Sequence, residues 1–320
     1  MKVENSTIQN KFLRVQTLNY GASLFEVYHK KNKINLILNL GSKEKYRNEH
    51  PSVGSTCGRY AGRISNSKFK IGNKKFILNA NEGKNILHGG KIGFSKIPWK
   101  KISQTKDKIV YQIYSRDNDQ GFPGNLIVNC TYKLKNNFLI IKYEYKSDKS
   151  THVNLTNHCY WNLEKNKKKM IYNHELKLNS YKYLQTNKKL IPTGKFKNIK
   201  NSIYNFSNFE NIGKKLNYFK NKKVNIKFKG FDTTFVIKKN TRNYVGTLKN
   251  NNIKINFFSN LPGVQLYSAQ NLNYKKKLFP YQGICLETQY FPDAPNKKNF
   301  PSTLIKPNKK YTCFTKIKIN

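Results

Sequence analysis

Apolar and polar side chains alternate residue by residue in several segments, and this alternation restricts the fold of the chain more than any other feature. In residues 139–146, leucine, isoleucine and tyrosine occupy one set of positions and mostly charged residues occupy the other. Successive side chains of a β-strand point to opposite faces, so the pattern predicts strands with one buried and one lysine-rich face. It recurs in residues 224–229, 253–257 and 311–319.

Turn residues separate these segments at hairpin-like distances. The clearest are Gly72-Asn73, Asn136-Asn137 and the asparagine run at 250–252, and no long amphipathic helix stands out. We therefore predict an all-β fold, mostly antiparallel and arranged as a sandwich. Because there is no Pro-, Gly- or Ser-rich linker and no internal repeat, one domain over residues 1–320 is expected. Three lysine-rich segments are expected to be solvated loops, at residues 165–169, 214–223 and 275–277.

The net charge raises the question of a polyanionic partner. Lys+Arg is 61 against 16 Asp+Glu, which gives a formal charge of +45. A polyanion-binding protein is therefore one hypothesis, although it rests on charge alone. Nearly all of this charge is lysine, whereas arginine supplies the bidentate fork used in base and phosphate recognition. The lysines are also spread through every segment together with Asn, Ile, Tyr and Phe. That distribution is typical of an AT-rich coding sequence. We expect salt-sensitive, nonspecific attraction of anions and no specific nucleic-acid partner. The arginines are Arg14, Arg47, Arg59, Arg63, Arg116 and Arg242.

Cysteine usage and the N-terminal residues suggest a reducing compartment. The five cysteines are odd in number, widely spaced and without a C-x-x-C pair, which argues against a disulfide framework and a zinc site. The first residues lack the apolar core of a signal peptide, and no run reaches the ~20 apolar residues of a membrane span. A cytoplasmic protein without a membrane partner is expected, either a monomer or a homodimer.

Residues 154–163 (Asn-Leu-Thr-Asn-His-Cys-Tyr-Trp-Asn-Leu) place His158 among amides, a hydroxyl and two aromatic rings. Histidine exchanges a proton near neutral pH, amides bond in defined directions, and aromatic faces pack against the apolar side of a sugar ring. The segment suggests a polar pocket; alternatively, His158 is a buried histidine satisfied by its neighbours. Tyr160 and Trp161 are expected to be packing groups.

A second segment, residues 283–296, sets the carboxylate of Glu287 in an apolar run. Acidic residues are scarce in this chain, and desolvation beside Cys285 and Leu286 would raise the pKa of Glu287 toward the working range. Together, Glu287 and His158 suggest a base and an acid.

These segments resemble the active-site motifs of the aldose 1-epimerase (galactose mutarotase) family. Seven short motifs, one of them within residues 283–296, occur in that family's order, which makes the resemblance specific and nearly end to end. They are N-Y-G-A at 19–22, G-R-Y-A-G-R-I at 58–64, L-H-G-G at 87–90, G-F-P-G at 121–124, F-D-T-T-F at 231–235, P-G-V-Q-L-Y at 262–267 and L-E-T-Q at 286–289.

The resemblance implies a large twisted antiparallel β-sandwich, the galactose mutarotase-like supersandwich, with few short helices. It also implies interconversion of the α and β anomers of a hexose, galactose or glucose, by ring opening and reclosure. By the same resemblance Glu287 is the base that deprotonates the C1 hydroxyl, and His158 is the acid that protonates O5. No cofactor and no metal are expected. The base and acid should face one another across a gap the size of a pyranose.

Four binding residues are also implied by the resemblance. Arg63 and Asp232 would bond to sugar hydroxyls, His88 would orient the substrate, and Gln265 would line the cleft. The sequence departs from the family at Gly62, where asparagine is usual, and after Asp232, where Thr-Thr replaces His-Asn. The remaining histidines carry no motif and are expected to be ordinary residues; they are His29, His50, His152 and His174.

Other functions stay open at this point. A noncatalytic sugar-binding protein would keep the same cleft. A glycoside hydrolase would use Asp232 and Glu287 as a carboxylate pair, which leaves His158 without a role. Neither the preferred hexose nor the acceptance of phosphorylated sugars follows from the sequence.

Overall fold

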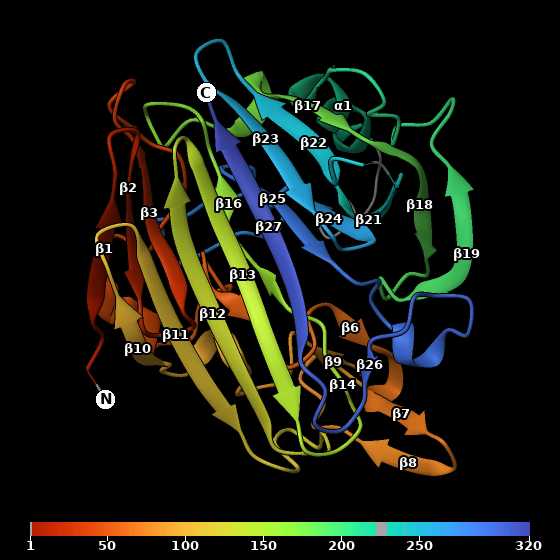
Figure 1. The fold of residues 1–320 in the computed structure, drawn as a ribbon. Coiled ribbons are helices and arrows are strands. Elements are labelled where there is room, and N and C mark those ends of the chain that lie inside the picture. The colour runs from red at the N-terminus through yellow and green to blue at the C-terminus, as the bar shows by residue number, and fades with distance from the viewer. Residues whose placement is uncertain (1, 222–228, 240) are drawn as a thin grey trace.

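The protein is built almost entirely from antiparallel strands, as predicted. The computed structural model describes residues 2–221, 229–239 and 241–320 (Figure 1). The largest sheet has nine strands. Two of the alternating segments, residues 139–146 and 311–319, lie in neighbouring strands at its centre. In sheet order the strands are β10 (Lys100–Gln104), β11 (Lys108–Ser115), β12 (Leu126–Lys135), β13 (Phe138–Ser147), β27 (Tyr311–Ile319), β23 (Lys254–Ser259), β22 (Tyr244–Lys249), β17 (Glu175–Leu178) and β20 (Glu210–Asn211).

A six-stranded sheet packs against the inner face of this sheet, and β25 passes behind β27 in Figure 1. Trp161 stacks edge-on against Phe257 with ring centroids 5.6 Å apart, and the hydroxyls of Thr288 and Thr315 are 2.5 Å apart. The two sheets therefore form the predicted sandwich. The second sheet contains, in order, β16 (Tyr160–Trp161), β25 (Ile284–Gln289), β24 (Gly263–Tyr267), β21 (Asp232–Ile237), β18 (Ser180–Thr186) and β19 (Pro192–Asn198).

Smaller sheets complete the fold. The N-terminal residues form a four-stranded sheet of β1 (Asn5–Gln9), β2 (Leu13–Leu18), β3 (Ser23–His29) and β4 (Ile34–Asn35). The paired short strands are β5 (Thr56–Cys57) with β15 (Thr156–Asn157), β6 (Arg63–Ile64) with β9 (Ile86–Leu87), β7 (Lys68–Ile71) with β8 (Lys74–Ile77), and β14 (Thr151–His152) with β26 (Leu304–Ile305).

The predicted hairpins are present. Gly72-Asn73 joins β7 to β8, Asn136-Asn137 joins β12 to β13, and the asparagine run joins β22 to β23. In β13 the predicted apolar face is buried and Lys142 and Glu144 lie on the other face. The strand predicted at residues 224–229 falls largely on 222–228, which lie outside the described residues.

One lysine-rich segment predicted to be a loop is instead helical. Residues Ile212–Lys220 form α1, the single α-helix of the described residues. The Asn211 side chain accepts a hydrogen bond from the Lys214 amide at 2.9 Å and so caps the helix. Ile212, Leu216 and Phe219 are buried at a spacing of one helical face, which stabilises the helix despite its lysines. Short 3₁₀ helices lie at Lys43–Arg47, Ser65–Ser67, Phe94–Lys96, Ile171–Asn173 and Ala294–Asn296.

All five cysteines are buried and unpaired. Among residues 2–221, 229–239 and 241–320, no helix has the length and apolar character needed to cross a membrane.

Candidate active site

The sheet register builds the floor of a cavity. Gln265 of β24 lies directly opposite Glu287 of β25 and Thr234 of β21, while Tyr267 lies opposite Asp232 and Cys285. Directly opposite residues share a face, and residues two apart in a strand share it too. These polar side chains therefore gather on one face of the six-stranded sheet, whereas Leu266 and Leu286 point to the core on the other.

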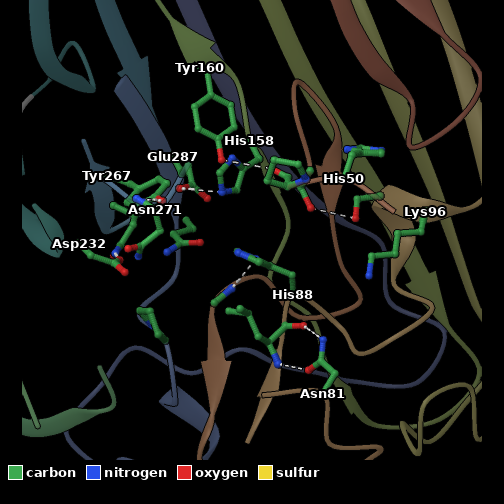
Figure 2. A pocket seen from close by; sticks show the side chains of 18 of the residues that line it. His50, Asn81, His88, Lys96, His158, Tyr160, Asp232, Tyr267, Asn271 and Glu287 are labelled. Atoms are coloured by element: carbon green, nitrogen blue, oxygen red, sulfur yellow. Dashed lines mark hydrogen bonds and ion pairs between the residues drawn. The ribbon is translucent and has the colours of Figure 1, made fainter. Parts of the chain in front are cut away.

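His158 reaches this floor from the turn between β15 and β16. Its Nε2 lies 3.7 Å from Glu287 Oε1, and both side chains are buried, with 8% and 3% exposed. On the other side of the ring, His158 Nδ1 lies 3.6 Å from Cys285 Sγ. The structure thus brings the two predicted proton-transfer groups into one place (Figure 2).

One detail of the predicted geometry is wrong. We expected the acid and base to face one another across the width of a sugar ring, but at 3.7 Å no ring fits between them. They stand side by side on one wall. O1 and O5 of a pyranose are bonded to the same carbon, so neighbouring groups are the arrangement that can reach both atoms.

The cavity beside the pair has a volume of about 270 Å³. Of the six predicted site residues, Glu287, His158, His88, Asp232 and Gln265 line it, and Arg63 does not. Residues that were not predicted to be site residues complete the wall, and they include Tyr160, which was predicted to be a packing group, and His50, which was predicted to be an ordinary residue. They are His50, Pro51, Ser52, Gly62, Asn81, Leu87, Gly90, Ser95, Lys96, Tyr160, Tyr267, Asn271, Gln289 and Pro292.

His88 follows β9 and stands edge-on to His158, with ring centroids 5.4 Å apart. Its Nδ1 accepts a hydrogen bond from the Gly62 amide at 3.3 Å. Gly89 and Gly90 have φ of 83° and 105°, as expected for a sharp turn in this motif. A Cβ on Gly89 would lie 1.9 Å from the Gly58 carbonyl oxygen, so only glycine allows this approach.

A chain of hydrogen bonds orients Asp232. Thr234 Oγ1 donates to Gln265 Oε1 at 2.5 Å, and Gln265 Nε2 donates to Asp232 Oδ1 at 2.5 Å. Gln265 therefore supports the carboxylate as well as lining the cavity. The Thr-Thr that follows Asp232 supplies the first donor of this chain, which gives that departure from the family pattern a structural role.

Arg63 lies behind the cavity wall. Its Nε and Nη2 donate to the two Glu82 carboxylate oxygens at 2.6 and 2.7 Å. Arg63 nevertheless acts on the site electrostatically, since its charge opposes the rise in the pKa of Glu287. A Cβ on Gly62 would lie 3.0 Å from Pro292, so glycine at this position allows Pro292 to pack closely against the backbone.

The first arginine of the same motif has a structural role. Arg59 is 2% exposed and donates to the carbonyl oxygens of Pro123 and Gly124 at 2.9 Å each. Two of the sequence motifs, at 58–64 and 121–124, therefore meet in space away from the cavity.

Burial moves the proton equilibria of the pair in opposite directions. Desolvation, followed by the charge of Asp232, raises the pKa of Glu287 well above its usual range. Desolvation lowers the pKa of His158 to about 4. Burial therefore favours the neutral form of each group, and a proton shared by the pair is favoured on the carboxyl group.

The described residues contain one group that resembles a metal-binding set, made of His158, Cys285 and Glu287. The thiol lies at Nδ1 of the imidazole and the carboxylate at Nε2. One ligand atom from each of the three residues lies within 4.8 Å of the other two.

Comparison with known proteins identifies the family of the chain. A family model described as aldose 1-epimerase matches residues 4–318. Galactose mutarotase from Homo sapiens is 30% identical over 321 residues, which cover 97% of this chain and 92% of that protein. Aldose 1-epimerase from Escherichia coli is 30% identical over 292 residues, covering 87% of this chain and 83% of that protein.

Solved structures are similar in fold. The galactose 1-epimerase of Lactobacillus acidophilus superposes with a TM-score of 0.89 at 28% identity, covering 100% of this chain and 95% of that one. An aldose epimerase homologue from C. elegans has a TM-score of 0.92 at 23% identity, covering 100% and 99%. The whole-chain match supports an enzyme over the noncatalytic and glycosidase alternatives. The chain belongs to the aldose 1-epimerase family of enzymes.

Proposed function

We propose that this enzyme interconverts the α and β anomers of a hexose, galactose or glucose, with Glu287 as the base and His158 as the acid. The observation that carries the proposal is the buried contact of 3.7 Å between these two groups beside a cavity of about 270 Å³. That volume is near the lower end of ligand pockets, which span about 300–1,000 Å³, and it suits one monosaccharide.

The reaction needs two proton transfers and no redox step. Glu287 takes the proton of the C1 hydroxyl, the C1–O5 bond breaks, and His158 protonates O5. The open-chain aldehyde then rotates about C1–C2. On reclosure O5 returns its proton to His158, and the carbonyl oxygen takes one from Glu287, so the pair ends as it began.

The acid and base assignment requires an ionised Glu287 and a protonated His158. Burial favours the neutral forms, but both arrangements hold the same single proton. We propose that the proton moves from Glu287 to Nε2 when sugar hydroxyls donate to the carboxylate. Cys285 helps in this scheme, because its sulfur can accept from Nδ1–H and leave Nε2 as the nitrogen that exchanges the proton.

His88, Asp232 and Gln265 are proposed to hold and orient the sugar. Asp232 would accept from ring hydroxyls, and His88 would donate from Nε2, since Nδ1 already accepts from Gly62. Because Arg63 lies behind the wall and is bound to Glu82, we propose that it acts on the sugar site through its charge, which interacts with Asp232 and Glu287.

Two variants test the acid–base pair. Glu287→Gln and His158→Asn should each slow anomer exchange of glucose or galactose by ~10²–10⁴-fold in polarimetry, because each removes one proton-transfer group. The double variant should lose little more than either single one, as expected for groups that act as a unit.

Glu175→Gln is the matched control, since Glu175 pairs with Lys249 on the other sheet at 2.6 Å. It should keep the wild-type rate. Saturation-transfer NMR should show that both site variants still bind sugar. A full rate in either site variant would remove the proposed mechanism.

A further inference from the structure

Four side chains form a group at one end of the cavity that the reaction above does not use. His50 and Ser52 come from the loop before β5, and Ser95 and Lys96 come from the 3₁₀ helix at Phe94–Lys96. We call this group the donor corner, because each member carries an N–H or O–H. Among the described residues that line the cavity, the acidic ones are Asp232 and Glu287, both on the six-stranded sheet.

His50 has an unused donor. The side chain is 5% exposed, and its Nδ1 accepts a hydrogen bond from the Val53 amide at 3.2 Å. Nε2 therefore carries the proton, and it has no acceptor among the described residues. An unpaired buried donor costs about 1–3 kcal/mol. Because Nε2 is itself buried, a ligand oxygen would reach it through a rotation of the ring toward the cavity, and the new hydrogen bond would remove this cost.

Lys96 adds a positive charge that is only weakly engaged. Its ammonium lies 3.3 Å from a Glu49 oxygen, but the Glu49 side chain is 89% exposed and that of Lys96 is 26% exposed. Ion pairs of this kind contribute about 0–1 kcal/mol. Next to it, Ser52 Oγ donates to Ser95 Oγ at 3.2 Å, which places two hydroxyls together. The corner thus combines a cation with several neutral donors.

The donor corner has a defined position relative to His158. The His158 amide donates to the Ser55 carbonyl at 2.8 Å, and the Gly54 amide donates to the His158 carbonyl at 2.9 Å. Tyr160 Oη also donates to the Pro51 carbonyl at 3.2 Å. In Figure 2, His50 and Lys96 lie on one side of His158 and Glu287, and Asp232 and Asn271 lie on the other.

The covalent structure of a pyranose then indicates which substituent reaches the corner. O5 is bonded to both C1 and C5, and C5 carries C6. When O5 is placed at His158 and the C2–C4 hydroxyls are directed toward Asp232, C6 lies on the side of the donor corner. This step rests on the proposed function.

We propose that the donor corner binds an anionic group on C6 of the sugar, and that hexose 6-phosphates are better substrates of this enzyme than free hexoses. A phosphate carries about −1.5 to −2 charge and three acceptor oxygens at neutral pH, which matches the ammonium, imidazole and hydroxyl donors. A hexuronate presents a carboxylate at the same carbon and is the second source of this chemistry.

The test compares anomer exchange of glucose, glucose 6-phosphate and glucuronate by NMR exchange spectroscopy at constant ionic strength. We expect kcat/KM for the 6-phosphate to exceed that for glucose by at least tenfold, mainly through KM. Lys96→Gln should reduce this ratio at least tenfold. His50→Asn should also reduce it, because asparagine can still accept from the Val53 amide but carries no donor at the Nε2 position.

Lys91→Gln is the matched control for the general positive field of the protein. Lys91 is exposed in the same connection and does not line the cavity, so this change should leave the ratio within twofold. A kcat/KM higher than that of glucose for glucuronate, but not for the 6-phosphate, would support anion binding at the donor corner and assign the bound group to a carboxylate.

Two results would count against the inference in different ways. Acceleration of free glucose with no advantage for either anion, and no response of the ratio to Lys96→Gln, would overturn the donor corner and leave the proposed function standing. An equal loss of the ratio in Lys91→Gln would show that the net charge alone attracts the anion. Absence of acceleration for every sugar would instead reject the proposed function.

Discussion

Ionisable side chains are exposed to water on the outer face of the nine-stranded sheet and buried in the cavity. On the outer face of β13, Lys142 and Glu144 form an ion pair of 2.8 Å with 39% and 46% of their side chains exposed, and water screens it. In the cavity, Glu287 and His158 approach to 3.7 Å with 8% exposed or less. Charged groups on the outer face therefore stay solvated, whereas the two buried groups have shifted pKa values.

The pH dependence of activity is the strongest test of this difference between cavity and surface. Burial lowers the pKa of His158 to about 4, so the pair gains a second proton, and loses its base, only below about pH 4. Burial and Asp232 raise the pKa of Glu287, so the pair keeps its last proton to a higher pH than an exposed glutamate would. Activity should fall tenfold per pH unit below about pH 4, and a second decline should appear at higher pH, where the last proton is lost.

The measurement is polarimetry corrected for the uncatalysed rate, with circular dichroism at each pH to establish that the protein remains folded. The two apparent pKa values will belong to the pair as a whole. A limb near pH 6.5 would mean that His158 titrates as an exposed histidine, and the contrast between cavity and surface would be lost.

A second prediction concerns the buried face of the outer sheet. Leu139 of β13 is 0% exposed and lies opposite Leu134 and Ile317. Leu139→Ala should reduce the free energy of unfolding by ~2–5 kcal/mol, because it leaves a cavity in the core. Denaturant unfolding measures the loss, and kcat of the remaining folded protein should be unchanged. A change below ~1 kcal/mol would indicate that the core here repacks.

The smallest expected effect is on the other face of the same strand. Lys142→Gln removes one charge and the ion pair with Glu144, yet it should change the free energy of unfolding by less than ~0.5 kcal/mol. The same denaturant titration applies, with Leu139→Ala as the reference for a large effect. A loss comparable to that of Leu139→Ala would show that outer-face charges contribute to folding.

Much of the site was predictable because the sequence motifs resemble those of the aldose 1-epimerase family. Glu287, His158, His88, Asp232 and Gln265 line the cavity, and the paired glycines after His88 adopt the expected conformation. His50 was treated as an ordinary residue, since no local pattern marks it and its place depends on contacts with Val53 and the backbone around His158. The helix at Ile212–Lys220 was missed although its asparagine cap and buried spacing were visible in the sequence.

By itself, the sequence determined the strand character of segments such as residues 139–146, their buried faces and the family. Alternation and motif order are local properties, and they survive without knowledge of distant contacts. Only the tertiary structure decided that Glu287 and His158 stand side by side, that Glu82 holds Arg63 behind the wall, and that His50 and Lys96 meet at one end of the cavity. These relations depend on strand register and on contacts between segments separated by tens to hundreds of residues, which no local pattern encodes.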